Sequence, residues 1–364
     1  MIKLFISKLS DNLDTPLLST IMILVVIGLT VLASASQENF YLLGNQFFNI
    51  IVGILVLYIF ANLQPRRILF YAPYLYIICL ILLLLVSIIG IESHGAKRWI
   101  DLGLINFQPS ELMKISLPLF IGSIYHHHQN NISIKAHTFS LIAILIPFLI
   151  ILKQPDLGTA IMIGASGFTI IFLAGLHWKV ISSSIFLLLL SAPFVWNMLY
   201  DYQQNRILNL LDPTKDPYGT GYHSIQSIIA IGSGGLFGKG WGNSSQSNLN
   251  FLPETTTDFI FSVFAEEFGF IGIVLIFLLY SFIFYRCFTL ASKMQNTFSK
   301  LVAASLSVSL FVATFVNIGM ISGIMPIVGI PLPFISYGGT SMVVSMASIG
   351  IIIGLYSNKS LIAN

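Results

Sequence analysis

Apolar runs as long as a membrane span recur along the whole sequence, and they constrain the fold more than any other feature. A helix needs about 20 apolar residues to cross the hydrocarbon core of a bilayer. We count ten such runs, of which the fifth and sixth are short and separated only by KQPD. The predicted spans are residues 16–33, 43–61, 73–90, 110–125, 138–152, 157–174, 179–200, 259–285, 299–321 and 339–356.

Composition supports the same fold class. Of the 364 residues, 56% are hydrophobic and only 9% are charged, whereas about 25% of the residues in soluble domains are charged. We therefore expect an all-α polytopic membrane protein with about ten transmembrane helices, in which residues 1–364 form a single membrane domain. We expect no cleaved signal peptide, because the first span would itself direct insertion. The net charge of +3 is too small to indicate nucleic acid binding, and Cys79 and Cys287 fit no disulfide or metal spacing.

The basic residues give a sidedness to these spans. Ten spans place both termini on one side, and the positive-inside rule makes that side the cytoplasm. Ten of the seventeen lysines and arginines then lie inside, and six lie in outer loops. The longest outer loop, about residues 201–258, joins the seventh and eighth spans. Because cations on the outer side oppose the topological preference, we expect them to have a function. The outer six are Lys97, Arg98, Lys153, Arg206, Lys215 and Lys239.

Asp258 stands where this polar loop turns into an apolar run, in LPETTTDFIFSVFAEEFGFIG. The sequence leaves two interpretations open. A carboxylate at a helix start is a favourable cap, worth about 0.3–1 kcal/mol through the helix dipole. A carboxylate at a membrane boundary is also a functional candidate by default. Glu266 and Glu267 lie two turns further along and are expected to pair with a buried cation.

The stretch RWIDLGLINFQPSELMK holds a second group of candidates. Glu111 and Lys114 are three residues apart, so they can pair on one helix face. The pair either makes a lysine tolerable in lipid or orients Lys114 toward a cavity that opens outward. Arg98 and Trp99 would offer an amphiphilic ligand a cation and a flat apolar surface.

Three further residues are candidates, each with a structural alternative. Asp156 follows Pro155 and is a good N-cap for the sixth span. Arg206 belongs to a stretch, NRILNLL, that suggests an interfacial amphipathic helix, where an arginine can simply extend toward lipid headgroups. Lys239 lies in IGSGGLFGKGWG, which does not match a phosphate-binding P-loop, because the lysine is followed by glycine.

Taken together, these residues place carboxylates, cations, aromatic rings and glycine-rich backbone on one face of the membrane. Such a set suits a reaction in which a hydroxyl loses a proton to a carboxylate base while a phosphate-type leaving group gains charge near cations. No Ser-His-Asp order and no zinc spacing is present. The histidines of HHHQ, residues 126–129, are interpreted as interfacial anchors rather than as a metal site.

Several long motifs resemble the SEDS (shape, elongation, division, sporulation) family over residues from about 15 to 356. They are RWIDLGLINFQPSELMK, QPDLGT, LLDPTKDPYGTGYHSIQS, AIGSGGLFGKGW, LPETTTDFIFSVFAEEFG and PLPFISYGGTS. The stretches GYHSIQS and GKGW resemble the elongation branch of the family more closely than the division branch. One departure is Thr255–Thr256, where relatives often carry a basic or imidazole residue.

The resemblance implies a specific activity and specific partners. Family members polymerise peptidoglycan glycan strands from lipid II at the bacterial cytoplasmic (inner) membrane, with inversion and loss of the lipid diphosphate. Asp258 matches the catalytic aspartate and would be the base. The residues that match the outward-facing cavity are Arg98, Trp99, Glu111, Lys114, Asp156 and Arg206, to which the residues themselves add Lys239 as a cation for the substrate. The family partner is a class B penicillin-binding protein, a transpeptidase.

Three questions stay open at this point. No metal ligand set is evident, so whether the enzyme needs a divalent cation as a cofactor is undecided. A flippase for the lipid-linked precursor, and a division or sporulation paralogue, remain alternative functions. A scaffold that only holds the transpeptidase is a weaker third class.

Overall fold

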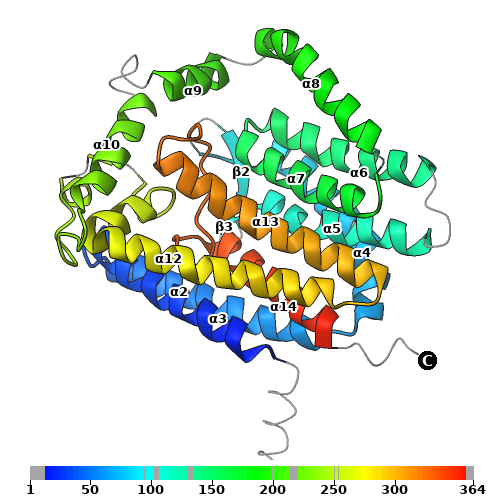
Figure 1. Cartoon of the computed structure of the whole chain (residues 1–364), viewed down its shortest axis with the longest axis horizontal. Coiled ribbons are helices and arrows are strands. Elements are labelled where there is room, and N and C mark those ends of the chain that lie inside the picture. The colour runs from blue at the N-terminus through cyan, green and yellow to red at the C-terminus, as the bar shows by residue number, and fades with distance from the viewer. Residues whose placement is uncertain are drawn as a thin grey trace, which may run out of the picture.

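The predicted helical membrane fold is confirmed, and ten long helices correspond to the ten predicted spans (Figure 1). The computed structural model describes residues 13–93, 96–101, 106–128, 134–176, 178–198, 201–212, 220–249, 251–252 and 254–357. The ten helices are α2 (Thr15–Ala35), α3 (Phe40–Asn62), α4 (Pro65–Ile89), α5 (Pro109–His127), α6 (Ile134–Lys153), α7 (Leu157–Leu173), α8 (Trp178–Met198), α12 (Ile260–Ser292), α13 (Thr297–Ile321) and α14 (Gly339–Ser357).

Length and apolar composition identify the chain as a multi-pass membrane protein. Within the described residues, seven helices are long and apolar enough to cross a bilayer, namely α2, α3, α4, α6, α12, α13 and α14. Helix α7 is apolar but shorter. Helices dominate because a helix satisfies its backbone hydrogen bonds internally, which lipid requires.

The start of α4 differs from the prediction. The apolar run suggested a span from residue 73, but the helix begins at Pro65 and continues through Pro73. Pro65 occupies the first turn, where its missing N–H costs nothing. Arg66 and Arg67 therefore belong to the helix, outside the predicted span.

Two segments outside the long helices are more regular than the sequence suggested. The predicted loop of residues 201–258 contains α9 (Asp201–Leu211), α10 (Thr220–Ser233) and α11 (Ser245–Asn248). Helix α9 includes the stretch NRILNLL, so the helix expected there is confirmed. Between α4 and α5, a small antiparallel sheet in the order β1-β2-β3 is formed by β1 (Ile91–Ser93), β2 (Ala96–Asp101) and β3 (Asn106–Phe107).

An ion pair and a hydrogen bond connect α2 and α12, which run antiparallel. Asp14, which caps α2, pairs with Arg286 at 2.9 Å. Some twenty residues on, the Ser34 hydroxyl donates a hydrogen bond to the carboxylate of Glu267. Because Arg286 follows Glu267 on α12 whereas Asp14 precedes Ser34 on α2, the two helices run in opposite directions. Figure 1 shows them side by side.

Helix α14 packs closely on α3 through two glycines in the sequence GIIIG. A Cβ on Gly350 would lie 2.4 Å from the carbonyl oxygen of Leu57, and one on Gly354 would lie 2.5 Å from that of Phe60. Small residues four apart allow two helices to approach in this way. The contact places the end of α14 beside the end of α3.

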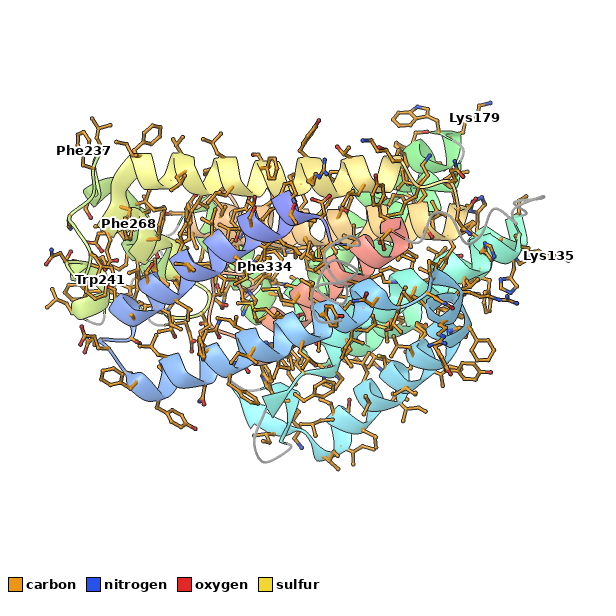
Figure 2. The ribbon with its side chains drawn as sticks, turned by 90° about the horizontal axis from the view of Figure 1, so that it is seen from below. Lys135, Lys179, Phe237, Trp241, Phe268 and Phe334 are labelled. Carbon is orange, nitrogen blue, oxygen red and sulfur yellow. The ribbon has the colours of Figure 1, made fainter. Side chains whose placement is uncertain are left out.

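These contacts define two ends of the bundle. One end contains the starts of α2 and α4 and the ends of α3 and α14. The opposite end contains the ends of α2 and α4, the sheet, and the starts of α5, α7 and α12. Figure 2 shows Lys135 and Lys179 at the first end, and Phe237 and Trp241 at the second. We call the second end the loop end.

Candidate active site

Asp258 lies at the loop end, two residues before α12, and its side chain is half-buried. The N-cap of α12 is Phe259, and no side-chain capping bond is made there. Asp258 is therefore not the capping residue. Its Oδ2 lies 3.1 Å from where a Cβ on Gly329 would be. Gly329 has φ of 71°, a conformation that L side chains rarely adopt.

The turn that carries Asp258 is fastened to the segment between α13 and α14, residues 322–338. The Ser336 hydroxyl donates to the carbonyl of Thr257 at 2.7 Å, and the Tyr337 amide donates to that of Thr256 at 3.0 Å. On α13, the Asn317 side-chain amide donates to the main-chain carbonyl of Asp258 at 2.9 Å. These bonds connect residues far apart in the chain, and they fix the direction in which the turn enters α12.

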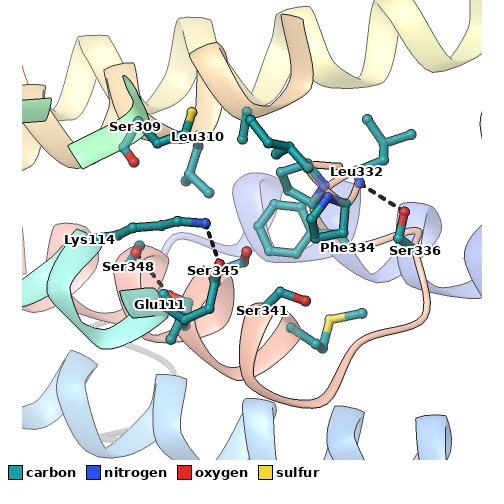
Figure 3. A pocket seen from close by; sticks show the side chains of 17 residues that line it. Glu111, Lys114, Ser309, Leu310, Leu332, Phe334, Ser336, Ser341, Ser345 and Ser348 are labelled. Carbon is teal, nitrogen blue, oxygen red and sulfur yellow. Dashed lines mark hydrogen bonds and ion pairs between the residues drawn. The ribbon is translucent and has the colours of Figure 1, made fainter. Parts of the chain in front are cut away.

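Glu111 and Lys114 form the predicted ion pair, with Lys114 Nζ 2.5 Å from Glu111 Oε1. Both side chains are largely buried, at 12% exposure for Lys114 and 6% for Glu111. They lie in the first turns of α5 and line a cavity of about 30 Å³, room for about one water molecule. Serines of α13 and α14, among them Ser309, Ser345 and Ser348, line the same cavity (Figure 3).

One segment separates Asp258 from this cavity. Gly329 approaches the carboxylate of Asp258, while Ile330 to Phe334 and Ser336 line the cavity that contains Glu111 and Lys114. Asp258 itself does not line the cavity. Residues 329–336 therefore contact both the carboxylate of Asp258 and the cavity of the Glu111–Lys114 pair.

Asp156 caps α7, as the sequence allowed. Its carboxylate accepts hydrogen bonds from the Thr159 amide at 3.0 Å and from the Thr159 hydroxyl at 2.8 Å. The side chain of Gln108, just before α5, donates to Oδ2 at 3.3 Å. A Cβ on Gly158 would lie 2.8 Å from the carbonyl oxygen of Val328, so this corner also packs against the segment beside Asp258.

Arg98 reaches the same corner from strand β2. Its guanidinium donates to the carbonyls of Gln154, at 3.3 Å, and Pro155, at 2.5 Å. Arg98 thus connects the sheet to the reversal between α6 and α7. Trp99 is half-buried in β2 opposite Ile91 of β1. The roles predicted for Arg98 and Trp99 toward a substrate remain predictions.

Lys239 belongs to a different cluster. Its ammonium lies 2.6 Å from Oε1 of Glu266 and 3.0 Å from the Ser245 hydroxyl. Glu266 is fully buried and also accepts hydrogen bonds from the Ser244 hydroxyl at 2.6 Å and the Ser245 amide at 3.1 Å. The expectation that Glu266 pairs with a cation is confirmed, but that cation is partly exposed rather than buried. Glu267 accepts instead from the Ser34 hydroxyl and the Gly242 amide. The geometry ties Lys239 to α12, and its predicted contact with substrate remains a prediction.

The remaining predictions concern Arg206 and metal ions. Arg206 lies on α9, is half-buried, and does not line the cavity with Glu111 and Lys114. Across the part of the chain that the structure describes, no three His, Cys, Asp or Glu side chains are grouped so as to hold a metal ion. The divalent cation that the sequence left open is not assigned to any residue.

Two polar residues of this region were not singled out from the sequence. Asn317 lies fully buried on α13 and Gln108 lies buried just before α5. Asn317 could have been found from the sequence, because it is an amide close to the end of an otherwise apolar run. A buried amide in such a run needs hydrogen-bond partners. Gln108 gave no comparable signal, since QPSE marks a helix start with or without a function.

Comparison with known proteins decides the family. A family model described as "Cell cycle protein", covering FtsW, RodA and SpoVE, matches residues 13–361. The chain belongs to the FtsW/RodA/SpoVE family. The family suggested by the sequence motifs is therefore confirmed.

Relatives with three different names are similar over nearly the full length of this chain. The peptidoglycan glycosyltransferase MrdB of Escherichia coli is 43% identical over 353 residues, which cover 97% of this chain and 95% of the relative. Stage V sporulation protein E of Bacillus subtilis is 34% identical, with 94% and 96% covered. A probable FtsW glycosyltransferase of Haemophilus influenzae is 33% identical, with 93% and 89% covered.

Solved FtsW/RodA/SpoVE structures share the fold. A chain in a structure described as "Structural coordination of polymerization and crosslinking by a peptidoglycan synthase complex" matches with a TM-score of 0.84 at 30% identity, covering 96% of this chain and 98% of that one. The rod shape determining protein RodA of Thermus thermophilus matches with a TM-score of 0.73 at 28% identity, covering 95% and 97%.

Proposed function

We propose that this protein is a peptidoglycan glycosyltransferase that polymerises glycan strands from lipid II during cell elongation, with Asp258 as the general base. The observation that carries the proposal is the placement of Asp258. Its half-buried carboxylate does not cap α12, it is approached by the backbone of Gly329, and it lies at the same end of the bundle as the buried Glu111–Lys114 pair. The 43% identity to a peptidoglycan glycosyltransferase supports the same activity.

In the proposed reaction, one carboxylate oxygen of Asp258 takes the proton from the acceptor hydroxyl of one sugar. The hydroxyl oxygen forms a bond to the anomeric carbon of the donor sugar, and the bond from that carbon to the diphosphate oxygen breaks. The diphosphate leaves on the undecaprenyl lipid with the bonding electrons. A single displacement of this kind inverts the anomeric centre, and a positioned general base contributes about 10²–10⁴-fold to the rate.

The leaving diphosphate gains negative charge and needs cations nearby. Two described cations lie next to the segment beside Asp258: Lys114 lines a cavity with residues 330–334, and Arg98 binds the corner that packs on Val328. Lys114 is held by Glu111 at the cavity, and Arg98 is held at the corner where α7 begins. Glu111 is a positioning residue in this scheme, because it aims the ammonium of Lys114. Trp99, Asp156 and Arg206 complete the proposed substrate-binding set, with Asp156 acting through the start of α7.

We place both termini in the cytoplasm of a bacterial cell and the loop end on the outer side of the membrane, in agreement with the positive-inside rule. Lipid II would then be used on the side where the glycan strand grows. A class B penicillin-binding protein is the proposed partner. The similarity to a chain from a peptidoglycan synthase complex that couples polymerization to crosslinking supports such a partner.

The decisive experiment compares wild-type protein with Asp258→Asn, each reconstituted with a class B penicillin-binding protein and given lipid II. We expect glycan products on a gel to fall about 10²-fold or more with Asp258→Asn, while membrane insertion and partner binding persist. Wild-type rates from Asp258→Asn would refute the general-base role. Translocation of lipid II by the protein alone, unchanged in Asp258→Ala, would instead favour a flippase.

A further inference from the structure

A groove with a cavity volume of about 590 Å³ lies where α3 ends and α4 begins, on the side of the bundle away from the loop end. Its floor is apolar and includes Ile68, Ala72 and Leu119, which are all buried. Phe70 and Tyr71 form an aromatic rim and are 62% and 61% exposed. The size lies within the range of small-molecule binding sites, about 300–1,000 Å³.

Arg66 and Arg67 border the same groove and give it a positive end. Both side chains are exposed, and within the described residues neither guanidinium has a hydrogen-bond or ion-pair partner. No carboxylate lines the groove. Asp14 is the one acidic residue at this end for which the structure describes a position, and Arg286 already binds it. The positive charge of the groove is therefore not neutralised by described protein groups.

The groove lies at the end of the bundle opposite to Asp258. The contact of Gly354 with the carbonyl of Phe60 places the end of α3 beside the end of α14, and α4 starts three residues after α3 ends. Helix α4 has 25 residues, which corresponds to roughly 37 Å at 1.5 Å per residue. A ligand in this groove would thus occupy the opposite leaflet from a substrate at Asp258.

We propose that this groove is a binding site for one anionic phospholipid of the surrounding leaflet. The phosphate would accept hydrogen bonds from Arg66 and Arg67, and the acyl chains would lie along the apolar floor. Arginine donates to phosphate through two parallel N–H groups. A soluble anion would leave the apolar floor unfilled, and a neutral lipid would leave the two guanidinium charges uncompensated. An anionic lipid satisfies both features.

The site also has a structural consequence. Leu119 in its floor belongs to α5, the helix that carries Glu111 and Lys114 about one to two turns closer to the loop end. A lipid in the groove would contact α3, α4 and α5 together. We therefore expect occupancy to raise the thermal midpoint of the protein.

The test uses delipidated wild-type protein in a neutral detergent, titrated with phosphatidylglycerol or phosphatidylcholine and followed by native mass spectrometry. We expect one phosphatidylglycerol to bind in preference to phosphatidylcholine. Arg66→Gln/Arg67→Gln should weaken phosphatidylglycerol binding roughly tenfold or more, since each basic residue near an anionic lipid surface contributes about a factor of five. Binding of phosphatidylcholine should not change.

Lys135→Gln/Lys179→Gln is the matched control, because it removes two exposed positive charges at the same end but outside the groove (Figure 2). We expect this control to bind phosphatidylglycerol as wild type does. An equal loss in the control would assign the effect to net charge and overturn the site, as would unchanged binding in the arginine variant.

If the arginine variant does not fold, competition by inorganic phosphate on the wild-type protein tests the site instead. Inorganic phosphate should not displace phosphatidylglycerol at concentrations that leave the protein folded, because it cannot fill the apolar floor. Displacement by phosphate would mean a site for a free anion and would overturn the assignment to lipid. Equal affinity for the two phospholipids would overturn it as well.

Discussion

Asn317 donates from its side-chain amide to the main-chain carbonyls of two residues, Asp258 at 2.9 Å and Ile330 at 2.7 Å. Asn317 is fully buried. Through these two bonds, α13 joins the turn that carries the proposed base to the segment that lines the cavity with Glu111 and Lys114. Together with the bonds from Ser336 and Tyr337 to the same turn, this amide helps to set the position of the carboxylate relative to that cavity.

Replacing Asn317 with alanine should lower both stability and polymerisation. The change leaves two main-chain carbonyls without their donor, and an unsatisfied buried polar group costs about 1–3 kcal/mol. We expect a lower thermal midpoint and at least tenfold slower glycan synthesis per folded molecule. The control is Asn296→Ala, which removes the cap at the other end of α13, where Asn296 accepts from the Phe298 amide at 2.9 Å. It should cost about 1 kcal/mol without slowing the folded enzyme. Equal activity in the two variants would contradict this.

The Glu111–Lys114 pair can be tested separately for folding and for catalysis. Lys114→Met leaves a buried carboxylate unpaired, and breaking a buried ion pair in this way costs about 3–5 kcal/mol. Glu111→Gln combined with Lys114→Met should recover most of that stability, because no charge remains buried. We expect the double variant to stay inactive in the lipid II assay, since the ammonium proposed to face the diphosphate is gone. A stable, active double variant would reduce the pair to a structural role.

Lys239 and Glu266 allow a similar experiment with the opposite expected outcome. Lys239→Met should destabilise the protein, because fully buried Glu266 loses its cation. Adding Glu266→Gln should restore the thermal midpoint. We expect polymerisation to return with it, because the structure places the Lys239 ammonium on Glu266 rather than near Asp258. If the double variant proves stable but inactive, Lys239 contacts the substrate as the sequence first suggested.

Gly329→Ala should impair catalysis through local strain. The residue has φ of 71°, which costs an L side chain about 1–2 kcal/mol, and the new Cβ would lie 3.1 Å from Asp258 Oδ2. We expect slower polymerisation with a modest loss of thermal stability. Gly44→Ala is the control, because no atom lies within 4 Å of the added Cβ and the site is within α3. That change should stabilise the helix by about 0.5–1 kcal/mol and leave activity intact.

The sequence was enough to name most residues of the candidate site, but not to predict which of them contact each other across the fold. The i, i+3 spacing of Glu111 and Lys114 was sufficient to predict their ion pair, because helix geometry alone brings such residues together. The capping of α7 by Asp156 was also local. The partner of Glu266 was predicted only as a cation. Its identity as Lys239 depends on how the segment after α10 folds back onto α12, which no local pattern encodes.

The sequence by itself determined that this chain is a bundle of about ten membrane helices with its polar loops and most of its candidate residues at one end. The reason is physical: a lipid-embedded segment must satisfy its own backbone hydrogen bonds, so apolar length is enough to specify a helix. Only the tertiary structure decided that Asp258 is not the cap of α12 and that Asn317 and residues 329–336 hold it beside the cavity. The two residues of each contact are far apart in the sequence, by 59 positions for Asn317 and Asp258 and by 79 for Ser336 and Thr257. Only packing between helices brings them together.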